Sequence, residues 1–375
     1  MAKFVALTSL GLQDSLKNEL QQLGIKRCSI SSSGVNFESS WQQAYQVCIG
    51  SRVVSRVLWP IKDFFAYSLD DVYEQTSKID FTKFIDARSS FCVDATVKEC
   101  KVGNSHELAL KFKDAFVDQM RKNFGFRPDV DTKTPRIRFS IKGYKNKFSV
   151  AVDLSGGSLA HRGYRKETTT APLRENLASA ILSILDFKSY PVVLDPMCGS
   201  GTFLIEAALQ LSGKLPRCVE RFGFESLKTY RKHEYLKAKS SLLFNSNSGA
   251  MPQLVGRDFD RKNIDISIRN ARAAKVSRLI DFCVGEISQL KNTFGERGLI
   301  VVNPPYGERL GEVEMLKDLY HTMGEVFKSE FKGWDIGFLS GGKDLSSGLG
   351  LKATQKVPLK NGTIDCRLLR YSVYS

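Results

Sequence analysis

Two short stretches, about a hundred residues apart, constrain the fold of this chain more than any other feature. Residues 192–203 and residues 299–307 each begin with an apolar run and end in polar and small residues. This pattern is typical of a buried parallel strand that stops at a functional loop. Ligands of open parallel sheets bind at the carboxyl ends of the strands. We therefore expect both loops to face one site.

The first loop predicts a ligand-binding turn at the start of a helix. Asp195 closes the strand, and Gly199 and Gly201 let the backbone come close to a ligand. The loop lacks the Gly-Lys-Ser/Thr of a phosphate loop and the third glycine of the dinucleotide fingerprint. Asp195 would repel a pyrophosphate, but it could accept a hydrogen bond from a cationic or amine-bearing ligand such as S-adenosylmethionine. A tight turn without a ligand is the alternative.

The second loop suits the exocyclic amine of a nucleobase, whose lone pair is delocalised into the ring and attacks poorly. The side-chain oxygen of Asn303 and the carbonyl of Pro304 could accept its two hydrogens and favour the tetrahedral form that attacks. Pro305 stiffens the turn, and Tyr306 offers a face on which an extruded base can stack. An ordinary Asn-Pro turn with Tyr306 as packing is the alternative, and the presence of the first loop argues against it.

Residues 194–202 (LDPMCGSGT) and 303–310 (NPPYGERL) together resemble the THUMP-domain RNA methyltransferases. Within them the chain is most similar to the bacterial enzymes that make N2-methylguanosine in 23S ribosomal RNA. The resemblance includes residues 159–165 and 171–178 and covers nearly the whole chain. In some bacteria a second methyltransferase module follows this one. The chain ends where that module would begin, so the resemblance implies the single-activity form.

The resemblance implies an α/β fold: a doubly wound, Rossmann-like class I methyltransferase domain preceded by α+β ferredoxin-like and THUMP domains. We expect the ferredoxin-like unit at 1–50, the RNA-binding THUMP domain at 51–155, a linker at 156–170 and the methyltransferase domain at 171–375. Alternating strands and helices after residue 190 favour the same parallel sheet. Asn361-Gly362 predicts a hairpin that closes this sheet with an antiparallel pair.

Two more strand ends supply cofactor candidates. Asp258 ends one strand and could accept both ribose hydroxyls, and the match to the family's second motif implies that Phe259 packs on adenine. Glu286 stands where the family usually has Asp, so Ile287 could contact adenine through its backbone instead. Arg174 is a further candidate. The expected cofactor-binding residues are Asp195, Pro196, Cys198, Gly199, Ser200, Gly201, Thr202, Asp258, Phe259, Glu286, Ile287, Asn303, Thr170 and Asn176; the expected catalytic residues are Asn303, Pro304, Pro305 and Tyr306.

A net charge of +15 favours a polyanionic partner. The charge is densest in residues 121–147, where nine basic residues stand against two acids, with aromatic residues between them. We interpret this stretch as a groove for RNA backbone; a solvated surface is the alternative. The expected RNA contacts are Arg121, Lys122, Arg127, Lys133, Arg136, Arg138, Lys142, Lys145 and Lys147. The resemblance implies 23S ribosomal RNA, or a large-subunit precursor, as the partner.

The remaining composition sets limits. Eight scattered cysteines without a Cys-x-x-Cys pair indicate reduced thiols in a cytoplasmic protein and no metal site. No apolar run is long enough to span a membrane, and we expect a monomer. The basic and aromatic insert at 214–247 either covers the active site, contacts RNA or forms solvated helices.

Our first hypothesis is therefore S-adenosylmethionine-dependent methylation of guanine N2 in 23S ribosomal RNA. N2-guanine methylation of transfer RNA and N6-adenine methylation of DNA are alternatives, because the loop motif serves any exocyclic amine. An RNA-binding assembly factor with a vestigial catalytic domain is a third. The missing third glycine disfavours a dehydrogenase.

Overall fold

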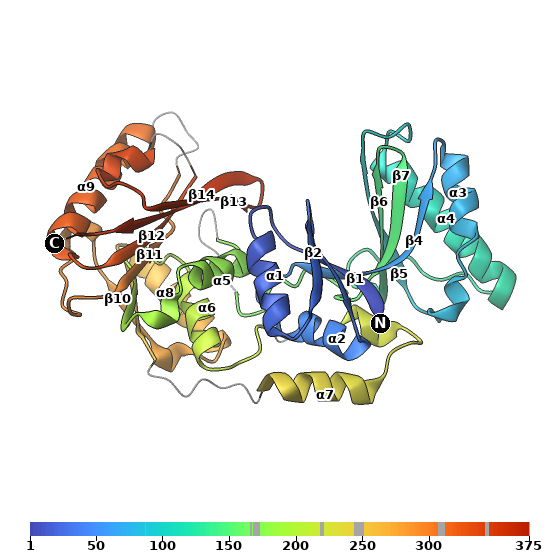
Figure 1. Ribbon diagram of the computed structural model, residues 1–375, viewed down its shortest axis with the longest axis horizontal. Coiled ribbons are helices and arrows are strands. Elements are labelled where there is room, and N and C mark those ends of the chain that lie inside the picture. The colour runs from blue at the N-terminus through green and yellow to red at the C-terminus, as the bar shows by residue number, and fades with distance from the viewer. Residues whose placement is uncertain are drawn as a thin grey trace.

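Two seven-stranded sheets with their helices make up the molecule (Figure 1), here a computed structural model. The residues that it describes are 1–86, 88–165, 167, 173–217, 221–243, 251–306, 312–341 and 345–374. None of the helices in this part of the chain is long and apolar enough to cross a membrane. The seven cysteines that it includes carry no disulfide.

The N-terminal sheet has the strand order β2-β3-β1-β4-β7-β6-β5. Its strands are β1 (Ala2–Leu7), β2 (Arg27–Ser31), β3 (Gly34–Ser39), β4 (Arg56–Phe65), β5 (Phe91–Lys98), β6 (Ile137–Tyr144) and β7 (Lys147–Asp153). The first residues of β4, Arg56 to Leu58, pair with β1, and Leu58 to Phe65 pair with β7 across a register shift at Ile61, so β4 belongs to both halves. The two α+β units expected from the sequence therefore share one continuous sheet. The exact domain boundaries stay a prediction.

Helices cover this sheet unevenly. α1 (Gln13–Gln22) and α2 (Trp41–Gly50) belong to the first half, and α3 (Leu69–Ser77) and α4 (Ser105–Phe124) to the second. Ser40 caps α2, because its hydroxyl accepts the amide of Gln43 at 3.2 Å. The rings of Phe112 and Phe116 on α4 pack on Phe139 of β6 with centroids 5.2 and 5.0 Å apart. Figure 1 shows α3 and α4 on one side of β4 to β7, with the other face turned toward the rest of the molecule.

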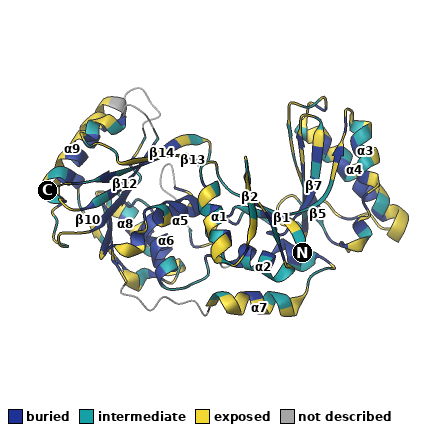
Figure 2. Cartoon of the chain, in the orientation of Figure 1, coloured by how far each residue is buried: buried dark blue, intermediate teal, exposed yellow. Residues whose placement is uncertain are grey.

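The C-terminal sheet confirms the predicted parallel fold with its closing hairpin. Its order is β10-β9-β8-β11-β12-β14-β13, and β14 runs antiparallel to β12 and β13. The strands are β8 (Val192–Asp195), β9 (Gln253–Asp258), β10 (Ile280–Val284), β11 (Leu299–Val302), β12 (Asp335–Ser340), β13 (Gln355–Asn361) and β14 (Ile364–Ser372). All residues of β8 and β11 are buried, and Figure 2 shows their neighbour β12 mostly in the dark blue of buried residues. Burial on both faces explains why these strands are continuous apolar runs.

Among the described residues of the C-terminal half, one α-helix precedes these strands in the chain and four lie between them. They are α5 (Glu175–Ile184), α6 (Thr202–Leu211), α7 (Lys232–Leu243), α8 (Arg261–Ala273) and α9 (Glu312–Glu330). α7 belongs to the insert predicted at 214–247 and packs against α2. Gln46 donates to the hydroxyl of Ser241 at 2.8 Å, and the rings of Tyr45 and Phe224 lie 4.4 Å apart. The described part of the insert is therefore bound to the N-terminal sheet.

A buried ion pair fixes the N-terminal half to α6. The side chains of Arg162 and Glu206 are fully buried, with Nε and Oε1 3.4 Å apart. Tyr164 and Ser179 also donate hydroxyl hydrogens to the Glu206 carboxylate, at 3.2 and 2.9 Å. Arg162 donates in turn to the backbone oxygen of Arg52, in the segment before β4. One network therefore connects both halves of the molecule.

We expect Glu206→Ala to lower the free energy of unfolding by about 3–5 kcal/mol, because Arg162 would stay buried without its counter-charge. Glu38→Ala is the matched control. It removes an ion pair to Arg27 whose partners are 33% and 73% exposed, and it should cost at most about 1 kcal/mol. Urea unfolding followed by circular dichroism measures both values. Equal losses in the two variants would contradict a structural role for the buried pair.

Candidate active site

The loops after β8, β9, β10 and β11 surround one cavity of about 360 Å³. A volume of this size lies within the range of roughly 300–1,000 Å³ typical of small-molecule sites. The residues that line it are Pro196, Met197, Asp258, Phe259, Gly285, Glu286, Ile287, Ser288, Pro305, Leu319 and Thr322. The two loops singled out in the sequence therefore meet at the carboxyl edge of the sheet, as the parallel order requires.

Asp258 joins the loop after β8 to the loop after β9 at the cavity wall. Its Oδ2 accepts the amide of Gly199 at 2.9 Å, while Oδ1 accepts the amide of Asp260 at 3.0 Å and the side chain of Asn263 at 3.1 Å. A carboxylate accepts about four hydrogen bonds. These contacts leave Asp258 room for about one ligand hydroxyl, where the sequence suggested two.

Hydrogen bonds from neighbouring segments hold the glycine-rich loop after β8 in position. Gly199 and Gly201 have φ values of 54° and 79°, and Gly201 caps α6 in the left-handed conformation that favours glycine. The hydroxyl of Ser267 donates to the backbone oxygen of Gly199 at 2.7 Å, and Arg165 donates to the Thr202 hydroxyl at 2.9 Å. These contacts hold the loop in position. Cys198, Ser200 and Thr202 are buried and are not among the residues that line the cavity.

Asp195 lies buried behind the cavity, with 2% of its surface exposed. It accepts the amide of Met197 at 3.2 Å. Burial, and then the nearby charge of Asp258, raise the pKa of Asp195 well above its ordinary value. Asp258 and Glu286, which both line the wall, make this edge of the sheet acidic. None of the described residues that line the cavity is basic, so the site suits a cationic ligand and disfavours a phosphate.

The second loop follows β11, and one of its residues reaches the cavity. Pro305 lines the cavity, and its backbone oxygen accepts the hydroxyl of Tyr320 at 3.2 Å. The hydroxyl of Tyr306 donates to Oδ1 of Asn303, the atom expected to accept the amine. Burial raises the pKa of Tyr306, so this hydroxyl remains a donor. The Tyr306 ring was expected to be a stacking face, yet its hydroxyl here occupies the amide acceptor.

The structure gathers some of the predicted cofactor residues and separates others. Five of them line the cavity, namely Pro196, Asp258, Phe259, Glu286 and Ile287. Asn176 does not: it is buried in α5, and its amide donates to the backbone oxygen of Val53 at 3.2 Å. Arg174 precedes α5, and its backbone amide donates to the side-chain oxygen of Asn361 at 3.4 Å in the closing hairpin. Thr170 lies outside the described residues.

Sequence reasoning missed five residues of the lining. Met197, Gly285 and Ser288 follow strands already identified. They lie within two residues of Pro196 or Glu286 in the sequence, so the same reasoning could have included them. Leu319 and Thr322 come from α9 and share one face of that helix because they are three residues apart. Nothing in the local sequence shows that α9 folds back over the strand ends.

The basic stretch of residues 121–147 does not form a single cluster. Arg121 and Lys122 end α4, whereas Lys145 and Lys147 lie at the turn between β6 and β7. The eight residues of β6 separate these two ends by roughly 23 Å, at about 3.3 Å a residue. Between them, the guanidinium of Arg138 pairs with Asp94 at 2.9 Å. The expected RNA contacts therefore fall on two opposite ends of the domain.

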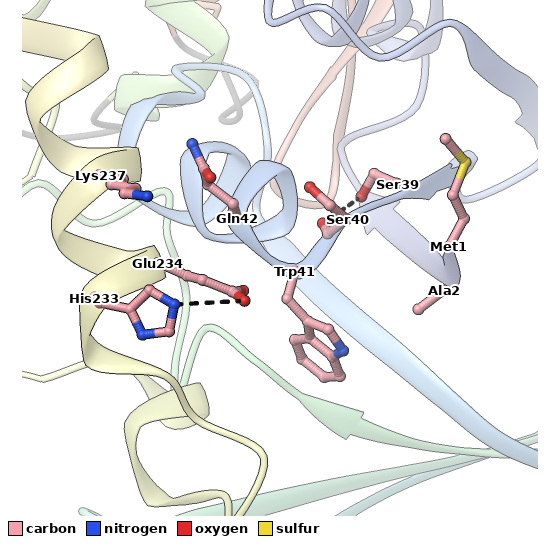
Figure 3. Close-up of a pocket in the computed structure, with 9 residues that line it drawn as sticks. All are labelled: Met1, Ala2, Ser39, Ser40, Trp41, Gln42, His233, Glu234 and Lys237. Atoms are coloured by element: carbon pink, nitrogen blue, oxygen red, sulfur yellow. Dashed lines mark hydrogen bonds and ion pairs between the residues drawn. The ribbon is translucent and has the colours of Figure 1, made fainter.

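A larger cavity of about 530 Å³ lies away from the strand ends (Figure 3). It is lined by the start of β1, the N-terminus of α2 and one face of α7. Figure 3 shows His233, Glu234 and Lys237 on α7 facing Trp41 and Gln42, with the imidazole 4.0 Å from the Glu234 carboxylate. No predicted site residue reaches this cavity. We therefore place the chemistry in the smaller one.

Comparison with protein families matches three successive parts of the chain. An RlmL ferredoxin-like domain matches residues 3–58, a THUMP domain residues 66–153, and an RMKL-like methyltransferase domain residues 162–370. A ribosomal RNA large subunit methyltransferase K/L from Syntrophotalea carbinolica is 36% identical over 99% of this chain. The chain spans 53% of that relative's length.

Solved structures resemble the whole chain. SMU.472, complexed with SAH, has a TM-score of 0.90 and 26% identity and covers 100% of this chain and 98% of its own. A Listeria monocytogenes protein described as a "predicted N6-adenine-specific DNA methylase" has a TM-score of 0.86 and 26% identity, with coverage of 99% and 96%. The methyltransferase match alone covers more than half of the chain. The chain therefore belongs to the RMKL-like methyltransferase family and carries that family's domain behind RlmL ferredoxin-like and THUMP domains.

Proposed function

We propose that this protein transfers the methyl group of S-adenosylmethionine to the exocyclic N2 amine of a guanine in 23S ribosomal RNA. The observation that carries the proposal is the acidic cavity at the strand ends, with Pro305 of the Asn303–Tyr306 loop in its wall. SMU.472 was solved with SAH, the demethylated form of this donor. When bound, S-adenosylmethionine supplies a methyl group activated by a sulfonium.

The residues around the cavity fit that donor. Asp258 would accept a ribose hydroxyl through its remaining lone pair. Phe259 is 68% exposed, and it lines the cavity with Ile287, which gives two apolar surfaces for adenine. The negative charges of the wall favour the sulfonium. A pyrophosphate would meet these same charges without a basic residue among the described lining.

Asn303 and Pro304 would orient the exocyclic amine of the guanine for attack. Their oxygens would accept its two hydrogens, which holds the nitrogen lone pair toward the donor. Positioning of this kind contributes a large part of the rate when the leaving group is already good. In the present geometry the Tyr306 hydroxyl donates to Oδ1 of Asn303, which leaves the second lone pair of that oxygen for the amine.

We expect Tyr306→Phe to keep kcat/KM for RNA within about threefold of wild type or above it, because the ring can still stack and Oδ1 of Asn303 is freed. Tyr306→Ala is the matched variant. It should lower kcat/KM roughly 5- to 150-fold, which corresponds to a stacking energy of about 1–3 kcal/mol per base. Single-turnover methylation measures both variants. Equal losses would show that the hydroxyl acts in the reaction and that the ring does not stack.

The choice of ribosomal RNA rests on two matches. The relative from Syntrophotalea carbinolica is named as a ribosomal RNA methyltransferase, and a THUMP domain matches residues 66–153. The name of the Listeria protein favours DNA adenine as the competing substrate. The cavity does not choose between them, since both substrates present an amine on a ring.

A single assay separates these substrates. The purified protein is incubated with methyl-labelled S-adenosylmethionine and with protein-free 23S ribosomal RNA, transfer RNA or duplex DNA, and the digested product is separated into nucleosides. We expect label in N2-methylguanosine from 23S RNA. Label in N6-methyladenosine or its deoxy form, or label in transfer RNA alone, would refute the proposal. No transfer to any of the three would favour an assembly factor.

A further inference from the structure

In the described part of the chain, one face of the THUMP part of the sheet carries no α-helix (Figure 1). Along β6 the residues Phe139, Ile141 and Gly143 are buried, and they point toward the helices, because Phe139 packs on α4. Lys142 and Tyr144 alternate with them and are exposed. Successive side chains of a strand point to opposite faces. Tyr144 therefore lies on the helix-free face, which Figure 1 shows turned toward the methyltransferase domain.

Four exposed side chains form a row across the end of this face. The strand pairing aligns Lys98 with Tyr144, Tyr144 with Lys147, and Lys147 with Phe65. Residues paired across strands point to the same face, and neighbouring strands lie about 4.8 Å apart. The row therefore alternates cation and ring over roughly 14 Å. Phe65 is 61% exposed and Tyr144 45% exposed, so both rings are open to a ligand.

The row is fixed in place by the turn beside it. Lys145 and Asn146 have φ values of 48° and 60°, the pattern of a two-residue type I′ hairpin turn. The side-chain oxygen of Asn146 accepts the amide of Lys101 at 2.7 Å, and its backbone oxygen accepts the amide of Ala66 at 3.1 Å. Three loops therefore meet around Asn146. Because these hydrogen bonds already hold the row in one conformation, the row loses little conformational entropy when a ligand binds.

Two more cations lie over rings at this end of the sheet. The Lys145 ammonium lies 5.4 Å from the centre of the Tyr144 ring, and the Lys101 ammonium lies 5.3 Å from that of Tyr67, which is 55% exposed. Two carboxylates offset part of the charge, since Lys147 pairs with Asp63 at 3.3 Å and Lys98 with Glu99 at 3.8 Å. The lysines outnumber these acids, so the surface remains basic.

We propose that the row Lys98–Tyr144–Lys147–Phe65 binds unpaired RNA, with bases stacked on the two rings and phosphates next to the lysines. This inference rests on the proposed RNA substrate and deepens it. Exposed rings between cations suit single strands, because a base within a duplex has no free face to offer. Duplex RNA would be held by phosphate contacts alone.

The test compares two pairs of ring deletions by fluorescence anisotropy. The full chain is titrated into a labelled single-stranded RNA and into a duplex of the same sequence. Phe65→Ala/Tyr144→Ala should raise the Kd for the single strand at least about fivefold for each ring lost and leave the Kd for the duplex within about twofold. The control is Phe124→Ala/Phe126→Ala, which removes two rings of 45% exposure at the opposite end of the domain. It should change neither Kd by more than about twofold.

Lys147→Glu provides an independent variant that removes no ring. It should weaken binding of both RNAs and flatten the dependence of log Kd on log salt concentration. The inference is overturned if wild type binds and methylates RNA while the Phe65/Tyr144 variant binds like wild type, or if the control pair has the larger effect. If wild type neither binds nor methylates RNA, the proposed function fails as well.

Discussion

Asn303→Ala is expected to lower the turnover of methyl transfer roughly 100- to 1,000-fold while the Kd for S-adenosylmethionine stays within about twofold of wild type. The range is that found when one preorganised polar contact to a reacting group is removed. The carboxamide is expected to act on the amine of the base, and it is not among the side chains that line the cavity. Single-turnover kinetics and calorimetric titration with S-adenosylmethionine measure the two quantities separately.

Asn303→Asp is the matched control, because it keeps an acceptor oxygen at the same position and replaces the NH2 group by a second oxygen. It should retain more turnover than the alanine variant. Unchanged turnover in Asn303→Ala would show that the assigned chemistry is wrong. Loss of cofactor binding together with turnover would instead place Asn303 in the donor site.

Asp258→Ala is expected to raise the Kd for S-adenosylmethionine roughly 10- to 100-fold, since hydrogen bonds to charged groups contribute about 1.5–3 kcal/mol. The variant should also be less stable. The amides of Gly199 and Asp260 and the side chain of Asn263 would lose their acceptor, at about 1–3 kcal/mol for each donor left unsatisfied. Calorimetric titration and thermal unfolding measure the two effects.

Asp260→Ala is the control that separates the effect of Asp258→Ala on cofactor affinity from its effect on stability. Asp260 caps α8 by accepting the amide of Lys262 at 2.8 Å, and it does not line the cavity. Its loss should cost about 1 kcal/mol of stability and leave cofactor affinity within about twofold. Equal affinities in the two variants would contradict a direct contact between Asp258 and the cofactor.

The strand ends could be predicted from the sequence because burial leaves a local signature. β8 and β11 are apolar along their whole length, and Asp195 and Asn303 mark where each stops. Asp258 and Ile287 follow from the same rule at β9 and β10. Parallel order then brings these ends together without any long-range information, and the cavity lies where they meet.

Contacts between distant elements could not be predicted in this way. Asn176 was expected at the cofactor, yet its amide binds the backbone of Val53 in the N-terminal half. The insert was interpreted as an active-site cover, an RNA contact or solvated helices, and the sequence did not show that its helix α7 packs on α2. Residues 121–147 form one block in the sequence, but β6 carries the chain from one end of the domain to the other. In each case tertiary packing decides where the side chain lies.

A crystal structure of the protein with bound S-adenosylhomocysteine tests the central claim most directly. We predict density for the ligand in the cavity between Pro196, Asp258 and Ile287, with Oδ1 of Asn303 and the backbone oxygen of Pro304 facing the sulfur. Density for the ligand elsewhere, or these two oxygens turned away from the sulfur, would contradict it.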